Sequence, residues 1–216
     1  EIPVDLIHRE GIRDIHAKDF RYAGELGYTI KLLAVAQASD ELELLARVHP
    51  ALIPLDVPMA SVNGVLNAVE VEGDLVGPLW FQGPGAGAEP TASAVMGDIL
   101  SITESPEINS YHSATFDLFN IGSMNDHVCQ YYIRLTASDQ PGVLANVARV
   151  LGDAGISISA VLQKDTDIEN MQADLVIMTH PAREDNMQTA VSLIRKLETV
   201  ICLDSLIRVE KYTGRL

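Results

Sequence analysis

Apolar residues recur along this chain with two different periods, which predict strands and helices respectively. In the first part of the chain, apolar runs predict three strands, over Leu6–Ile12, Tyr28–Ala38 and Leu42–Leu52. The second run is almost continuously apolar, so we expect that strand to be buried. A helix is predicted over Ala17–Leu26, with Phe20 and Ala23 on its buried side and Gly27 at its end.

Two further strands and a glycine-rich loop follow. The runs Leu66–Glu72 and Leu75–Phe81 flank the dipeptide Gly73-Asp74, which is a strong signal for a β-hairpin. The second strand leads into the stretch FQGPGAGAEPTASAVMGDIL, residues 81–100, where a glycine-rich loop opens into a helix. Glycines allow close approach of the backbone to a ligand, and a helix N-terminus carries roughly +0.5 charge. The stretch therefore predicts one wall of a cofactor site.

Hydrophobic periodicity is clearest after residue 128. Strands are predicted over Tyr131–Thr136, Ile156–Gln163, Met171–Thr179 and Ile201–Lys211, and helices over Val143–Asp153 and Asp185–Leu197. The order βαββαβ is the ferredoxin-like arrangement. Its two helices cover one face of a four-stranded antiparallel sheet, which leaves the other face or an edge for pairing. Residues 101–127 lack sustained periodicity and are rich in Ser, Asn and Asp, so they are expected to form a linker.

Composition narrows the function classes. The 216 residues are 47% hydrophobic and 21% charged, which is typical of a folded chain of one large or two small domains. A formal net charge of -15 argues against a nucleic-acid or anionic-membrane partner, and no apolar run approaches the roughly 18–20 residues of a membrane span. Two cysteines form neither a disulfide framework nor a metal site, so a cytoplasmic location is expected. Because the chain opens at Glu1 within a strand-like run, we expect a piece of a longer protein.

Metal and nucleophile chemistry find little support in the residue spacing. His8, His16 and His49 are not spaced as metal ligands, so no zinc site is expected. Ser61 and Ser93 have no histidine and acid nearby in sequence, so a nucleophilic triad is not indicated.

The string YYIRLTASDQPGVLANVARVLGDAGISISAVLQ, residues 131–163, resembles the ACT domain, a regulatory module that binds amino acids. The resemblance extends over about residues 129–212. It implies that the effector lies where the first strand–helix turn meets a partner domain. There the helix start faces a carboxylate, and Asp139 or a neighbouring carbonyl receives an ammonium. The candidate effector-binding residues are Asp139, Gly142, Val143, Leu144 and Ile156. In the alternative interpretation Asp139 only caps the helix, Gly142 only makes the turn, and the domain only dimerises.

The first half resembles the C-terminal part of homoserine dehydrogenase. The matching strings are EGIRDIHAKDFRYAGELGYTIKLLAVA (10–36), RVHPALIP (47–54), MASVNGVLNAVEVEGDLVG (59–77) and GPGAGAEPTASAVMGDIL (83–100). The resemblance implies an enzyme that reduces aspartate semialdehyde to homoserine with NADP or NAD, on the way to threonine and methionine. It implies Gly87 as a cofactor-contacting glycine, with Gly85 and Ala86 as weaker candidates.

Parts of the family's pattern are missing from these residues. The Rossmann domain, the catalytic lysine and the acidic substrate-binding pair precede the matching region, so no catalytic residue is assigned. Lys18 and Lys31 do not fall at the family's lysine position, and Lys31 is interpreted as a structural or interface residue. We therefore expect the chain alone to be inactive and to hold no cofactor.

The combined prediction is an α+β chain. Residues 1–100 are expected to form part of a mixed-sheet catalytic and dimerisation domain, 101–127 a linker, and 128–216 an ACT domain. The expected partners are an amino-acid effector, with threonine as the first candidate, and further copies of the chain in a dimer or tetramer. The competing hypothesis is a stand-alone amino-acid-binding regulator or dimerisation module without enzymatic activity.

Overall fold

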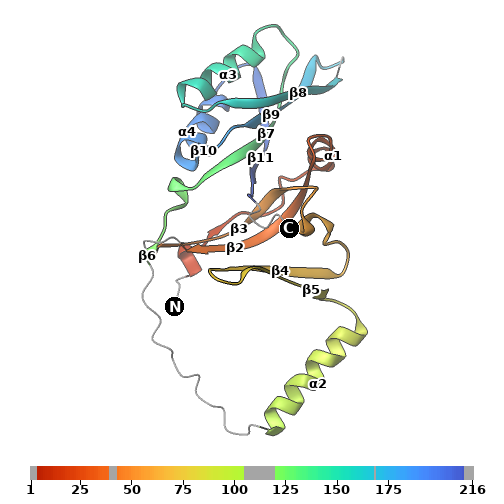
Figure 1. Cartoon of the computed structure of the whole chain (residues 1–216). Helices are drawn as coiled ribbons and strands as arrows, with labels where there is room; N and C mark the ends of the chain where they lie inside the picture. Colours follow the sequence, from red (N-terminus) through yellow and green to blue (C-terminus); the bar gives the residue numbers. More distant parts are fainter. Residues whose placement is uncertain (1–3, 39–42, 105–119, 168, 212–216) are drawn as a thin grey trace. The chain divides into compact units, whose positions relative to one another are not determined.

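The computed structural model describes residues 4–38, 43–104, 120–167 and 169–211 (Figure 1). By contacts the chain divides into two compact units. The sheet unit comprises the described residues before Asp56 and after residue 119. The loop unit comprises the described residues from Asp56 to residue 104.

The sheet unit is built on a mixed sheet of nine strands among the described residues. Its strands are β1 (His8–Arg9), β2 (Tyr28–Ala38), β3 (Glu43–Pro54), β6 (Asn120–Ile121), β7 (Val128–Ser138), β8 (Ile158–Asp167), β9 (Gln172–Thr179), β10 (Ala182–Arg183) and β11 (Val200–Val209). Its helices are α1 (Ala17–Glu25), α3 (Val143–Asp153) and α4 (Glu184–Ile194), with single 3-10 turns η1 (Val4–Leu6) and η3 (Met124–Asp126). The main path runs β1-β3-β11-β7-β9-β8, with β2 and β6 also paired to β3 and β10 paired to β7.

The second half of the chain forms the predicted βαββαβ arrangement. Strands β8, β9, β7 and β11 lie in that order and pair antiparallel throughout. Helices α3 and α4 cover one face, as Figure 1 shows, and an apolar cluster lies beneath them. Val147 and Leu151 of α3 meet Met187 and Ile194 of α4 within that cluster, and all four side chains are fully buried. The helical period predicted this packing, because Val147 and Leu151 lie four residues apart and Met187 and Ile194 lie seven apart, each pair on one side of its helix.

The opposite face and one edge of this arrangement are occupied by the first part of the chain. Tyr22 and Ala23 of α1 pack with Tyr132 of β7 and Ile207 of β11 in a second apolar cluster. The outer edge of β11 pairs in parallel with β3, through Arg208 with Ala51 and Val209 with Leu52. We expected the other face or an edge to be available for pairing, and both are covered within one chain.

Three local predictions for the first part of the chain are wrong, each for a physical reason. Phe20 is 52% exposed, because the buried face of α1 is set by Asp19, which pairs with a buried arginine. Strand β2 is mostly half-buried or exposed, because it pairs with β3 at the margin of the sheet. The predicted strand over Leu6–Ile12 shortens to β1, which pairs with β3 over two residues.

The loop unit contains a hairpin and a long helix. Its elements are η2 (Pro58–Ser61), β4 (Leu66–Gly73), β5 (Gly77–Pro84) and α2 (Ala88–Glu104). The hairpin is confirmed, but Gly73 pairs with Gly77, so the connection has three residues and the second strand starts later than Leu75. The predicted helix is also confirmed, and it continues to Glu104. Within the predicted linker, residues 105–119 lie outside the described residues, and β6 and η3 follow them.

Candidate functional site

The turn between β7 and α3 presents the start of a helix without a capping side chain. Gly142 is the N-cap residue, with φ of +95°, and its carbonyl accepts the first helical hydrogen bond from Asn146 N at 3.0 Å. This left-handed conformation suits glycine because it has no Cβ. No side chain caps the N–H groups of the first turn of α3. These N–H groups can therefore bind an anionic group.

Asp139 does not cap α3, so that part of the alternative interpretation is wrong, whereas a domain that only dimerises stays a prediction. Its carboxylate Oδ1 accepts from Gln163 Nε2 of β8 at 3.3 Å, and its backbone N–H donates to Met171 O at 2.7 Å. Met171 has φ of 51°, an uncommon conformation for a residue with a side chain. Asp139 is thus bonded both to β8, through Gln163, and to Met171, which lies directly before β9. Gln163 and Met171 were not among the sequence candidates, because contacts with another strand leave no mark on local periodicity.

Three of the five candidate effector residues are exposed, and two are buried. Leu144 is 41% exposed on the first turn of α3, close in sequence to Asp139 and Gly142 at the surface. Val143 and Ile156 are buried in the apolar cluster under the helices. Geometry thus places Asp139, Gly142 and Leu144 where a ligand can reach them. Val143 and Ile156 lie beneath and support the turn.

The glycine-rich loop lies in the loop unit, between β5 and α2. Gly85 N donates to Val65 O at 2.8 Å, and a Cβ at Gly85 would lie 1.8 Å from Asn67 Nδ2. Gly87 has φ of +129°, and its carbonyl accepts from Thr91 Oγ1 at 2.7 Å. Position 87 thus needs glycine for its own backbone path, whereas an added Cβ at Gly85 would meet only the exposed side chain of Asn67.

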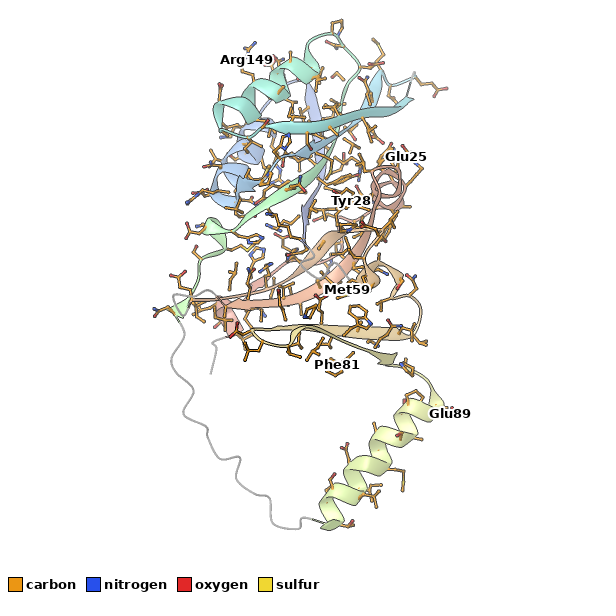
Figure 2. The ribbon with its side chains drawn as sticks, viewed as in Figure 1. Glu25, Tyr28, Met59, Phe81, Glu89 and Arg149 are labelled. Carbon is orange, nitrogen blue, oxygen red and sulfur yellow. The ribbon has the colours of Figure 1, made fainter. Side chains whose placement is uncertain are left out.

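The loop has features of a site for an anionic cofactor group. Ala86 and Gly87 are exposed immediately before α2, and Pro90 lies in its first turn, where proline is tolerated. Figure 2 shows Glu89 at this same end of α2, and Phe81 on β5. Because the Glu89 carboxylate shares the helix terminus, exposed loop backbone rather than the helix dipole alone would have to bind a phosphate.

A buried ion pair joins α1 to the central strand of the sheet. Asp19 is fully buried, and its Oδ1 accepts from Arg134 Nε at 2.7 Å and from Tyr132 OH at 3.0 Å. Its Oδ2 accepts from Ser205 Oγ at 2.9 Å and from His16 N at 2.8 Å. Burial works against the ionised carboxylate, but these hydrogen bonds and the charge of Arg134 outweigh it and lower the pKa of Asp19.

A second buried cluster centres on Arg208 of β11. Its guanidinium donates to both oxygens of Glu184, at the start of α4, and to Glu10 Oε2 at 2.8 Å. Tyr131 OH also donates to Glu184 at 2.8 Å. Burial opposes ionisation of Glu10, but hydrogen bonds from His8 and Arg208 outweigh it and lower the pKa to about 2.

A third cluster lies where β3 meets β11. Arg47 Nε and Nη2 donate to the two oxygens of Glu210, at 2.9 and 2.8 Å, and His49 Nε2 lies 3.0 Å from Glu210 Oε1. Burial opposes ionisation of Glu210, but hydrogen bonds from His49 and Arg47 outweigh it and lower the pKa to about 2. One pattern in the sequence is typical of such clusters. Arg134 and Arg208 each interrupt an apolar strand, and an arginine at such a position needs a partner.

The two lysines considered from the sequence have structural surroundings. Lys18 Nζ donates to Asp174 Oδ2 of β9 at 2.7 Å. Lys31 lies in β2, where partial burial lowers its pKa. In the described ranges, no group of three or more His, Cys, Asp or Glu side chains is arranged to hold a metal ion. None of the helices in the described part of the chain is long and apolar enough to cross a bilayer.

Comparisons with known proteins agree with both halves of the fold. Residues 1–100 match the family model for homoserine dehydrogenase, and residues 131–199 match that for the ACT domain. The homoserine dehydrogenase of Pseudomonas aeruginosa is 40% identical over 96% of this chain and 49% of its own length. That of Corynebacterium glutamicum is 34% identical over 97% of this chain and 48% of its own length.

A solved structure shows the same relation. The crystal structure of a homoserine dehydrogenase from Thiobacillus denitrificans superposes with a TM-score of 0.80 at 39% identity, over 97% of this chain and 49% of that one. The chain therefore spans about half the length of the relatives it matches. On these matches, the chain belongs to the homoserine dehydrogenase family and corresponds to its C-terminal portion, which carries an ACT domain.

Proposed function

We propose that this chain contributes to a homoserine dehydrogenase that reduces aspartate semialdehyde with NADP or NAD, and that its ACT domain senses an amino acid. The observation that carries the sensing role is the uncapped start of α3 beside the Asp139 carboxylate. One end of that site offers N–H donors and the other an acceptor, which matches the two charged groups of a free amino acid.

The proposed ligand is threonine, the end product expected from the family's reaction. Its carboxylate would accept from the first-turn N–H groups of α3, and its ammonium would donate to Asp139. Gln163 Nε2 lies 3.3 Å from the carboxylate oxygen Oδ1 of Asp139, so it can hold Asp139 in position or contact the ligand. Leu144 supplies an exposed apolar contact for the ligand side chain.

The glycine loop is proposed to lie against the cofactor of the complete enzyme. A bound nicotinamide cofactor supplies the hydride, and Gly87, Ala86 and Gly85 would form one side of its site. The positive φ at Gly87 supports this, because a residue with a side chain rarely adopts that conformation. The chain itself is proposed to have no dehydrogenase activity, to act in the cytoplasm, and to assemble with further copies through its sheet and ACT regions.

Isothermal titration of the 216-residue chain tests the sensing role. Threonine is the titrant, and methionine, isoleucine and lysine are the controls. Saturable heat with threonine and a strong loss of affinity in Asp139→Asn are expected, because the amide carries no charge to balance the ammonium. Gln163→Glu serves as a matched variant, since its added carboxylate repels Asp139. Absence of threonine binding by the unaltered chain would rule out threonine as effector of this site.

A further inference from the structure

Asp174 on β9 joins α1 to the strands that lead into the candidate effector loop. Only 4% of the residue is exposed. Its Oδ2 accepts from Lys18 Nζ at 2.7 Å and from Tyr22 OH at 3.0 Å, and both donors belong to α1. The Thr136 hydroxyl on β7 lies 3.4 Å from Asp174 Oδ1 and 2.9 Å from Asp204 Oδ2, so it can donate to either carboxylate.

Both strands that carry this bridge end at the effector loop. Thr136 pairs with Asp174 across β7 and β9, and it precedes Asp139 by three residues. Asp174 follows Met171 by three residues, and Met171 O accepts from Asp139 N at 2.7 Å. A displacement of the loop can therefore reach the Asp174 carboxylate along two short backbone paths, one in each of two paired strands.

The two aspartates that hold α1 differ in how readily their bonds can change. Asp19 is fully buried and accepts from Arg134, Ser205 and Tyr132, and leaving the charge of Asp19 or of Arg134 unpaired is costly. The Lys18 side chain is 49% exposed, so water can solvate its ammonium when the bond to Asp174 breaks, and the buried Asp174 carboxylate still accepts from Tyr22 OH. Helix α1 is thus held firmly at Asp19 and adjustably at Asp174.

We propose that Asp174 is a positioning residue that transmits amino-acid binding at the Asp139–Leu144 turn to α1. A bound ligand that draws the turn toward the start of α3 shifts Thr136 and Met171, and with them the Asp174 carboxylate. The contacts to Lys18 and Tyr22 then change, while Asp19 holds the other side of the helix. The movement continues past Gly27 into β2, in the part of the chain that matches the dehydrogenase family. The inference rests on the proposed sensing role, because it requires a ligand that binds the two arrangements unequally.

Amide hydrogen exchange of the 216-residue chain, with and without saturating threonine, tests the proposal. In the unaltered chain, threonine is expected to change exchange in residues 17–25 about fivefold or more, within the usual range of coupling between sites. Asp174→Asn is expected to bind threonine within about threefold of the unaltered affinity, while the change over residues 17–25 falls below about twofold. Asp185→Asn is the control, because its partner Arg183 is half exposed and their ion pairs join β10, α4 and η3 rather than α1. This control is expected to keep both the binding and the helix response.

Three results would overturn the proposal. Titration of the unaltered chain with threonine shows which of them also removes the sensing role. Saturable threonine binding without any change in α1 leaves the sensor in place and removes the transmission. A full α1 response in Asp174→Asn has the same meaning. No threonine binding by the unaltered chain removes the proposed effector and the transmission together. If Asp174→Asn does not fold, Lys18→Met replaces it, because that side chain is half exposed and the change keeps its apolar stem. An undiminished response in Lys18→Met then counts against the proposal.

Discussion

The sheet unit and the loop unit use apolar residues in opposite ways. In the sheet unit, apolar residues form two buried clusters on the two faces of one sheet, and one of these clusters combines residues from both parts of the chain. In the loop unit, α2 carries apolar residues that stay exposed in this chain. They are Val95, Met96, Ile99, Leu100 and Ile102, each about half exposed or more. The hairpin exposes Val69 and Phe81 as well.

This difference shows that a hydrophobic pattern specifies an element but does not supply the surface that covers it. Helix α3 has its partners within the chain, in α4 and in the strands beneath. Helix α2 is longer, yet none of its residues over 88–103 is buried. Exposed apolar surface of this extent is typical of a region that another protein segment covers.

Loss of the Asp19 carboxylate should give the largest effect and should be confined to the sheet unit. Asp19→Ala leaves Arg134 buried without its partner, which typically costs about 3–5 kcal/mol of folding free energy. Urea unfolding measures this loss if two signals are recorded. Trp80 is the single tryptophan and reports the loop unit by fluorescence, whereas near-UV circular dichroism of buried Tyr22, Tyr131 and Tyr132 reports the sheet unit. A loss below about 1 kcal/mol would show that solvent compensates Arg134 and that the pair is not structural.

The next largest effect should come from acid, which should destabilise the sheet unit more than the loop unit. Glu10 and Glu210 have pKa values of about 2 in the folded chain, against an ordinary value of 4.5. Because the folded state binds these protons less readily than the unfolded state, their stabilisation is complete above about pH 4.5 and is lost as the pH falls from there toward 2. The tyrosine signal should therefore weaken over this range while the Trp80 signal changes less. Glu210→Gln should reduce the loss of stability between about pH 4.5 and 2. If the dependence of stability on pH were unchanged in this variant, the ion pair of Glu210 with Arg47 would be contradicted.

A smaller effect is expected from Gly142→Ala at the start of α3. The residue has φ of +95°, so a side chain there is strained by about 1–2 kcal/mol although no atom lies within 4 Å of the added Cβ. Thermal unfolding measures the cost, and threonine titration shows whether the turn keeps its shape. Gly152→Ala within the same helix is the control, since its surroundings are also open and its φ is not positive. Equal stability of the two variants would mean that the turn adjusts freely.

The smallest effect should be a gain in the loop unit. Gly97 lies inside α2 with no atom within 4 Å of an added Cβ, so Gly97→Ala should stabilise the helix by about 0.5–1 kcal/mol. Far-UV circular dichroism at rising temperature measures helix content, and the tyrosine signal of the sheet unit should not move. A loss of helix content would indicate that α2 requires glycine for a contact with a partner surface.

Local patterns predicted most elements, and the failures share one cause. The limits of α3 were predicted without error from Val143 to Asp153, because its apolar spacing, glycine stop and preceding turn agree. The burial of Phe20 and of β2 was predicted wrongly, because which face of an element is covered depends on its neighbours. For the candidate sites, the glycines with positive φ at 87 and 142 could be identified in advance, since turn chemistry is local. The contacts of Asp139 with Gln163 and Met171 could not, since they cross from one strand to another.

The sequence by itself determined the periodic elements, the βαββαβ order, the hairpin, the glycine turns and the family resemblance. Each of these depends on neighbours along the chain, within a few residues. Only the tertiary structure decided that β3 extends the sheet at β11 and that α1 covers its second face. It also decided which charges are buried. Asp19 with Arg134, and Glu184 with Arg208, lie far apart in sequence and meet only when the sheet is assembled. Such pairing depends on desolvation and on geometry between distant segments, and neither is written in the local pattern.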